Sequence, residues 1–199
     1  MLPIMLDLLD RQCVVIGGGK IAARKIKKLL NTGAKIVVIS PFISDEIKEL
    51  ANEQKLVVLE REVLNEDYKD AFLVIAATDS FEVNQEIVSN VKSNQLICVV
   101  NKHELGNVHI PASFSRGKLQ ISVSTSGASP HLAKKIRNKL MNTYDESYEE
   151  YLDFLNECRL SLKELTDQGL KAQLLEELID EKYLQSTSER EQFKKRNHL

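Results

Sequence analysis

A run of three glycines near the N-terminus is the stretch of the sequence best suited to specific chemistry. It follows an apolar, β-branched run at residues 14–16 and precedes an amphipathic run that begins at Ile21. Gly17, Gly19 and Ala22 fit the pattern G-x-G-x-x-G/A of dinucleotide-binding turns. In that pattern the first glycine allows a sharp turn, the second lets a pyrophosphate approach the backbone, and the small third residue lets the helix pack on the sheet. The sequence therefore predicts a helix that presents free N–H groups to a dinucleotide, with an ordinary glycine turn as the alternative.

Polar residues also follow the predicted second and fourth strands, whose carboxyl ends line the cofactor crevice in open α/β sheets. Ser40 stands where such folds usually carry an acid for the ribose hydroxyls, and the lack of an arginine there favours NAD over NADP. A plain strand stop at Ser40-Pro41 is the alternative. Thr78 can bond a cofactor sugar or amide, whereas Asp79 is either a ligand or a helix cap. The predicted cofactor-binding residues are Gly17, Gly18, Gly19, Lys20, Ile21, Ser40, Pro41, Thr78 and Asp79.

Two further segments carry candidate functional groups. His103 follows the predicted fifth strand and can move a proton near neutral pH, although a solvated loop histidine is the alternative. His109 lies in an apolar strand pattern, which favours a structural role. The loop at residues 124–129 offers hydroxyls, backbone N–H groups and a helix N-terminus. It predicts a second anion site, or else a helix cap beside a solvated basic face; the side chains that can add charge are Arg116, Lys118, Lys134 and Arg137.

Net charge, apolar runs and cysteine usage exclude several classes of protein. The 199 residues carry a formal net charge of −2, which argues against a protein whose main task is binding nucleic acid. We find no apolar run of the roughly 18 residues that span a bilayer, and residues 1–9 lack the pattern of a signal peptide. Cys13 and Cys98 lie in apolar strand patterns and are predicted to be buried free thiols. Without metal-ligand spacing among Cys and His we predict no metal site, and the cysteine usage favours a reducing cytoplasm.

Strands alternate with helices over the first hundred residues, which predicts an α/β fold with a Rossmann-type parallel sheet. The predicted strands are residues 12–16, 35–40, 56–59, 72–77 and 96–100, and the predicted helices are residues 20–30, 44–52 and 80–91. Residues 2–6 are interpreted as a leading strand or an arm packed on the sheet edge. Ser44 is the expected N-cap of the second helix, and Asp79 that of the third, with Glu82 completing a capping box.

The pattern changes after the fifth strand. Residues 108–114 and 119–123 predict a hairpin, and Ser129-Pro130 predicts the start of a helix. From residue 144 the chain is expected to be helical, with a break at Gln168-Gly169 and a frayed helix or tail over residues 186–199. We predict an NAD-binding domain at residues 1–110, a dimerisation and substrate-loop region at 111–143, and a helical C-terminal domain at 144–199.

Four segments together resemble the precorrin-2 dehydrogenase family, which includes the dehydrogenase/ferrochelatase portion of siroheme synthases. They are VVIGGGKIAARK, VVISP, AATDSFEVN and VHIPASFSRGKLQISVSTSGASPHLAKKIR. The resemblance covers residues 2–144 and is most specific in ISVSTSGASPHLAKKIR. It implies NAD-dependent oxidation of precorrin-2 to sirohydrochlorin by a homodimer, with a tetrapyrrole as substrate and neither nucleic acid nor membrane as partner. Alternatives are a bifunctional dehydrogenase/ferrochelatase and a non-catalytic NAD-binding sensor.

The resemblance also implies site residues. Where the family has an aspartate assigned a catalytic role, this chain has Asn101, so either His103 or Glu104 takes that part or the reaction relies on positioning. This departure predicts weak or absent ferrochelatase activity. Thr125 stands at the place of a family serine. The predicted catalytic residues are Asn101, His103, Ser124 and Thr125, and the predicted substrate-binding residues are Arg116, Ser126, Gly127, Ser129 and His131.

Overall fold

The computed structural model describes residues 1–100 and 102–199 and divides the chain into two compact units, Met1–Ile110 and Pro111–Leu199. Asn101, which the sequence analysis predicted to be catalytic, lies outside the described residues. The proposed assignment of three functional regions to the chain stays a prediction.

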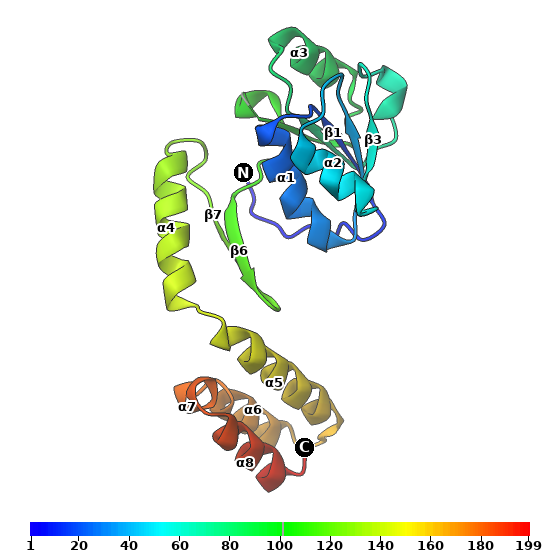
Figure 1. Ribbon diagram of the computed structural model, residues 1–199. Helices are drawn as coiled ribbons and strands as arrows, with labels where there is room; N and C mark the ends of the chain where they lie inside the picture. The colour runs from blue at the N-terminus through cyan, green and yellow to red at the C-terminus, as the bar shows by residue number, and fades with distance from the viewer. Residues whose placement is uncertain (101) are drawn as a thin grey trace. The chain divides into compact units, whose positions relative to one another are not determined.

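The N-terminal unit contains a five-stranded parallel sheet with helices on both faces (Figure 1). Its strands are β1 (Gln12–Ile16), β2 (Lys35–Ile39), β3 (Val57–Leu59), β4 (Leu73–Ala76) and β5 (Leu96–Val99), and its α-helices are α1 (Lys20–Leu29), α2 (Asp45–Asn52) and α3 (Phe81–Asn90). Short 3-10 helices lie at Leu30–Thr32, Asn65–Asp67 and His103–Leu105. The strands lie in the order β3-β2-β1-β4-β5. β2 and β3 are therefore on one side of β1, whereas β4 and β5 are on its other side. This order confirms the predicted Rossmann-type sheet.

Alternate residues of β1 supply two separate cores. Cys13 and Val15 pack on the face covered by α1 and α2, with Ala22 of α1 fully buried there. Val14 and Ile16 pack on the opposite face, which α3 covers. A strand buried on both faces must be apolar throughout, which explains why these strands show no polar alternation. Ala22 is thus a helix-to-sheet contact, as the glycine pattern predicted.

The predicted leading strand is wrong. Residues 1–7 form no strand, and Leu2 is 82% exposed, so the segment is not packed on the sheet edge either. Only Leu8 enters the core. The Leu9 N–H donates to Asp7 Oδ1 (3.0 Å), which forms a local turn just before β1. An apolar run becomes a strand only when a neighbouring strand pairs with its backbone, and here none does.

The start of the third helix and its N-cap each lie one residue later than predicted. Ser80, not Asp79, is the N-cap, and its hydroxyl accepts the Val83 N–H (3.2 Å). Glu82 is then one position too early for a capping box, and its carboxylate instead accepts the Ser80 hydroxyl (2.9 Å). Ser44 is the N-cap residue of α2, as predicted, but its hydroxyl caps nothing and is buried without a hydrogen-bond partner among the residues that the structure describes.

The C-terminal unit begins with an antiparallel hairpin of β6 (Ala112–Arg116) and β7 (Leu119–Val123), followed by α4 (Pro130–Thr143). The hairpin was predicted, but its first strand starts four residues later than expected. Residues 108–110 belong instead to the N-terminal unit. There the Val108 N–H and that of the preceding Asn107 donate to the Ile97 carbonyl. Ser129 caps α4, as predicted, by accepting the Leu132 N–H (3.2 Å).

The rest of this unit is helical, as predicted. It comprises α5 (Ser147–Ser161), a 3-10 turn at Leu162–Glu164, α6 (Gln168–Glu177), α7 (Glu181–Gln185) and α8 (Thr187–Asn197). The expected break exists but lies at residues 165–167, just before Gln168-Gly169. Gln168 and Gly169 instead begin α6, because Asp167 caps this helix by accepting the Gly169 and Leu170 N–H groups. The expected frayed tail is also wrong. Its residue Phe193 is 1% exposed and packs against the rings of Phe154 and Tyr183.

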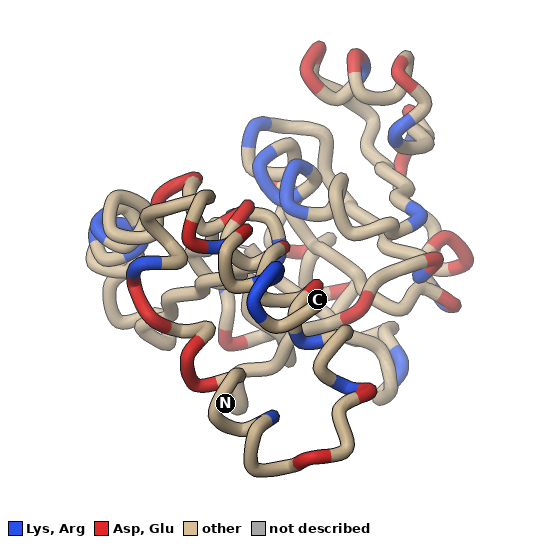
Figure 2. Tube along the Cα trace, turned by 90° about the horizontal axis from the view of Figure 1, so that it is seen from below, with Lys and Arg blue, Asp and Glu red and all other residues tan. Residues whose placement is uncertain are grey.

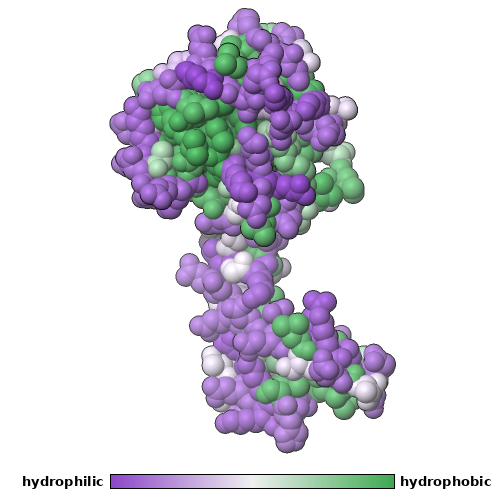
Figure 3. All heavy atoms as spheres, turned by 90° about the vertical axis from the view of Figure 1, so that its right-hand side faces the viewer, coloured by the Kyte–Doolittle hydropathy of each residue, from purple (hydrophilic) through white to green (hydrophobic). Residues whose placement is uncertain are grey.

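Charge is unevenly distributed along the chain, as the trace in Figure 2 shows. Residues 11–44 and 105–144 contain lysines and arginines but no acidic residue, whereas other segments carry both signs. Hydrophobic residues in the view of Figure 3 are concentrated in one area of the N-terminal unit, and hydrophilic residues cover most of the rest. Among the described residues, no helix combines the length and apolar character needed to cross a membrane. Cys13, Cys98 and Cys158 are buried free thiols, and burial raises the pKa of Cys13 to about 11.

Candidate functional site

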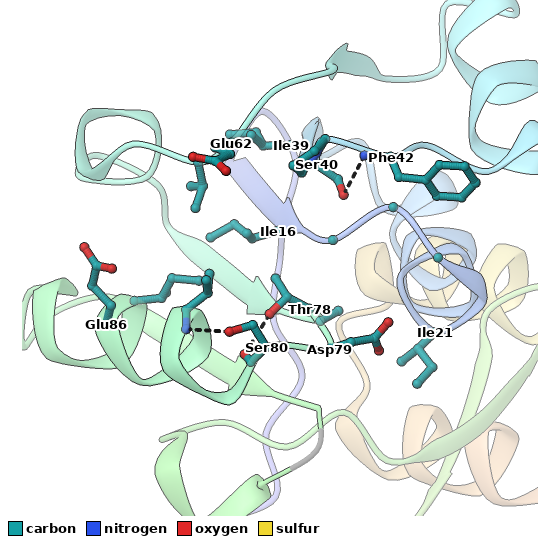
Figure 4. Close-up of a pocket in the computed structure, with 18 of the residues that line it drawn as sticks. Ile16, Ile21, Ile39, Ser40, Phe42, Glu62, Thr78, Asp79, Ser80 and Glu86 are labelled. Carbon is teal, nitrogen blue, oxygen red and sulfur yellow. Dashed lines mark hydrogen bonds between the residues drawn. The ribbon is translucent and has the colours of Figure 1, made fainter.

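A cavity of about 710 Å³ opens in the N-terminal unit at the carboxyl ends of β1, β2 and β4 (Figure 4). This is the edge of the sheet at which open α/β folds bind ligands. The structure brings all nine predicted cofactor-binding residues together in its lining. They are Gly17, Gly18, Gly19, Lys20, Ile21, Ser40, Pro41, Thr78 and Asp79.

The three glycines serve different purposes. Gly17 has a φ of +122°, and a Cβ there would lie 2.4 Å from the Ala77 carbonyl oxygen. A Cβ on Gly18 would lie 1.9 Å from the Phe42 carbonyl oxygen. A Cβ on Gly19 would meet no atom within 4 Å. The first two positions therefore exclude side chains by packing, whereas the third leaves an open approach to the backbone.

The start of α1 completes a cradle for an anion. Gly19 is its N-cap and has no side chain to occupy the first N–H groups of the helix. The first turn carries no acidic residue, and Lys20 adds a positive charge at the same place. Backbone donors, the helix dipole and open space at Gly19 fit the pyrophosphate of a dinucleotide.

The loop after β4 is held by a residue that the sequence analysis missed. Asn84 of α3 is 3% exposed, and its amide group donates to the Thr78 carbonyl (2.9 Å). The Thr78 hydroxyl lies 3.0 Å from the Ser80 carbonyl (Figure 4). The same hydroxyl lies 2.8 Å from Asn84 Oδ1. These bonds orient the Thr78 side chain at the cavity wall. An asparagine on a helix gave no sequence signal of this role, because its partner lies six residues away across a turn.

The far wall of the cavity was also missed. It is formed by the segment that follows β3 and by one face of α3, and its residues are Glu62, Val63, Asn65, Tyr68, Val83, Glu86 and Ile87. Tyr68 is buried, which raises the pKa of its phenol, and its hydroxyl donates to Asn65 Oδ1 (2.6 Å). A sequence signal was available, since the segment follows a strand of the same parallel sheet and must begin at the same edge.

The candidate proton-transfer residues lie elsewhere in this unit. His103 is exposed and is not among the residues that line the cavity. Its ring packs edge-to-face on His109, with centroids 5.2 Å apart, and its Nδ1 lies 3.6 Å from Glu104 Oε2. His109 lies in no strand, contrary to expectation, but its Nε2 is 3.0 Å from the His103 carbonyl. Its predicted structural role agrees with this contact.

In the C-terminal unit the loop at residues 124–129 folds as a tight turn. The Ser124 hydroxyl accepts the Ser126 N–H (3.2 Å), and the Thr125 hydroxyl accepts the Ser129 N–H (3.1 Å). Ser126 and Gly127 both have positive φ, at +49° and +88°. A hydroxyl that accepts one bond can still donate its own proton, so both groups remain chemically suited to hold a substrate oxygen.

The basic residues expected around this loop have different environments. Arg116 donates to the Ser115 carbonyl (3.1 Å), and its Nε is buried without a partner among the described residues. The Nε of Arg137 is buried in the same way. Lys118 is ion-paired with Asp153. His131 is exposed on the first turn of α4.

Comparison with known proteins decides the family. Residues 4–112 match the family described as putative NAD(P)-binding, residues 116–142 match the central region of sirohaem biosynthesis proteins, and residues 148–193 match the SirC C-terminal domain. A precorrin-2 dehydrogenase of Priestia megaterium is 41% identical over 97% of this chain and 96% of its own length. The chain belongs to the precorrin-2 dehydrogenase family. The resemblance stated from the sequence is thereby confirmed.

Two further comparisons agree with this family. The solved structure of SirC, a precorrin-2 dehydrogenase, superposes with a TM-score of 0.86 at 40% identity and covers 100% of this chain and 99% of its own. A siroheme synthase of Nitrosospira multiformis is 38% identical over 81% of this chain but only 35% of its own length. The chain thus corresponds to about a third of that relative and to nearly all of the dehydrogenases.

Proposed function

We infer that this chain oxidises precorrin-2 to sirohydrochlorin in siroheme biosynthesis, with NAD as the oxidant. The observation that carries this inference is the 41% identity with a precorrin-2 dehydrogenase over nearly the full length of both chains. The glycine cavity supports it independently, because its open position at Gly19 and its helix N-terminus suit a dinucleotide.

The cavity residues have distinct roles in this proposal. The backbone at Gly17–Gly19 and the first turn of α1, with Lys20 and Ile21, hold the pyrophosphate, while Pro41 and Asp79 bound the cavity beside it. Ser40 and Thr78 bond the sugars or the nicotinamide. NAD, when bound, accepts a hydride. The protein's contribution is to hold the macrocycle in position for that transfer and to provide a place for the proton that is also lost.

The C-terminal unit supplies the substrate-binding groups in this proposal. A tetrapyrrole with many carboxylates needs hydroxyl, N–H and cationic partners. The loop at residues 124–129 offers the first two kinds, Arg116 offers the third, and the exposed His131 adds a further polar side chain on the first turn of α4. Asn101, His103 or Glu104 receives or orients the departing proton. The assignment of these roles to individual residues is part of the proposal.

The proposal also covers the oligomeric state and the cellular location of the protein. The protein acts as a homodimer, as the resemblance implies, and the exposed Leu132 (48%) and Ile136 (38%) of α4 provide apolar surface for such a contact. It acts in the cytoplasm, which agrees with its three buried free thiols. Light scattering on the purified protein tests the first statement.

The decisive experiment is anaerobic incubation of the purified protein with precorrin-2 and NAD. We expect NADH to form in step with the spectral change from precorrin-2 to sirohydrochlorin. Gly19→Val is the matched control, because it blocks the cradle and should abolish both signals. Binding of NAD without NADH formation would contradict the proposal and favour a non-catalytic sensor.

A further inference from the structure

We propose that Glu62 makes the cofactor cavity select NAD over NADP, by supplying the acidic group that is missing after β2. The proposal rests on the proposed function, since it concerns the adenosine half of the same dinucleotide. Dinucleotide folds usually discriminate with an acid at the end of the second strand, which accepts the ribose hydroxyls and repels a 2′-phosphate. Here that position is Ser40, which carries no charge.

The pairing of β3 with β2 brings the segment that contains Glu62 next to the end of β2, where the acid is missing. β3 pairs with β2 in parallel, with Leu59 opposite Ile39, and the Ser40 N–H donates to the Leu59 carbonyl (3.2 Å). The chain therefore leaves β3 beside Ser40. Glu62 follows three residues after Leu59 and lines the cavity. In Figure 4 it lies on the same side of the cavity as Ile39 and Ser40, whereas Thr78, Asp79 and Glu86 lie on the opposite side.

Arg61, which precedes Glu62, is bound to a carboxylate and is therefore not available to bind the 2′-phosphate of NADP. Arg61 forms a two-pronged bond with Asp67, at 2.7 and 2.6 Å, and also donates to the Glu62 carbonyl (2.9 Å). Asp67 in turn accepts the Leu64 N–H (2.7 Å). This arrangement fixes the segment that carries Glu62. It also pairs Arg61, the cation adjacent to Glu62 in the sequence, with a carboxylate, so that this cation is not aimed at a ligand.

The charged residues that line the cavity favour rejection of the 2′-phosphate that distinguishes NADP from NAD. They are one lysine and three carboxylates: Lys20, Glu62, Asp79 and Glu86. Lys20 lies at the glycine turn, where the pyrophosphate uses it. A 2′-phosphate adds between about −1.5 and −2 charges and would meet Glu62 without a compensating cation. A 2′-hydroxyl would instead donate a hydrogen bond to the same carboxylate.

Calorimetric titration of NAD and NADP into the full-length protein tests the proposal, with 5′-AMP and 2′,5′-ADP as probes of the adenosine half alone. The wild type should prefer NAD and 5′-AMP. Glu62→Gln should reduce this preference about tenfold for both pairs of ligands, because the like-charge repulsion is removed. Glu60→Gln is the matched control, since Glu60 lies two residues away, pairs with Lys48 and does not line the cavity.

The outcomes separate this proposal from the one on which it rests. An unchanged NAD/NADP preference in Glu62→Gln, or an equal change in Glu60→Gln, would overturn the role of Glu62 while leaving dinucleotide binding intact. A wild type that binds neither dinucleotide would overturn the proposed function and this role together. Both substitutions are at exposed positions, and equal thermal midpoints of the two variants and the wild type would show that folding is unaffected.

Discussion

At the scale of single residues, different glycines of the turn serve stability and cofactor binding: Gly18 is needed for packing, and Gly19 for access of the dinucleotide. Gly18→Val should destabilise the protein by about 2 kcal/mol or more, because its Cβ would overlap the Phe42 carbonyl at 1.9 Å. Gly19→Val should change the unfolding free energy by only about 1 kcal/mol, the effect of a poorer N-cap, yet reduce NAD affinity at least about tenfold. Urea unfolding and calorimetry measure the two effects. Equal stability losses in both variants, or NAD affinity retained by Gly19→Val, would contradict this division.

A second residue-scale prediction concerns metal insertion. Asparagine cannot accept a proton, and general-base help is typically worth about 10²–10⁴-fold, so we expect sirohydrochlorin ferrochelatase activity to be weak or absent. Insertion of ferrous or cobaltous ion is followed in the wild type, Asn101→Asp and His103→Ala. A gain in Asn101→Asp would support the argument. Fast insertion by the wild type that survives His103→Ala would refute it.

At the scale of elements, the segment after β3 depends on one ion pair. The Arg61 guanidinium beside Asp67 holds the pKa of that carboxyl below its ordinary value of 3.8. A carboxyl with a lowered folded-state pKa contributes stability above its unfolded pKa and loses it as the pH falls through the folded value. Asp67→Asn should therefore destabilise the protein by about 1 kcal/mol at pH 7, since the pair is partly exposed. The difference from the wild type should shrink below pH 3.8.

Urea unfolding of both proteins across this pH range measures that difference. Other titrating groups affect both proteins alike, so they cancel in the comparison. Glu60→Gln again serves as a control, because its ion pair with Lys48 is exposed on both sides and should contribute little at any pH. A difference between wild type and Asp67→Asn that stays constant down to pH 2 would show that the pair does not stabilise the segment.

At the scale of the whole molecule, each unit has its own core. The N-terminal unit contains the two clusters on either face of its sheet, and the C-terminal unit contains a separate cluster around Phe154, Tyr183 and Phe193. A fragment of residues 1–110 should therefore fold and bind NAD with an affinity within about tenfold of the full chain. It should form no NADH from precorrin-2, because the proposed substrate loop is absent. Circular dichroism, calorimetry and the NADH assay test these expectations; an unfolded fragment would show that the N-terminal unit depends on the rest of the chain.

The sequence by itself determined the elements whose signals are local. Strands β1, β2, β4 and β5 were predictable because strands covered on both faces are apolar along most of their length. The glycine turn was predictable because Gly17 needs a positive φ and Gly19 must leave its backbone open. The start of α4 was predictable from Ser129-Pro130, since a cap and a proline act on the first turn alone.

Only the tertiary structure decided features that depend on partners distant in the sequence. Residues 2–6 look like a strand but have no strand beside them, and the polar segment that ends the chain is ordered because Phe193 finds Phe154 in another helix. Asn84 carries no local signal, and Glu62 is indicated only by its place after β3. Glu62 reaches the cavity through strand pairing, and Asn84 reaches Thr78 across a helix cap. Local preferences are written residue by residue, whereas pairing and burial are set by whichever segments the folded chain brings together.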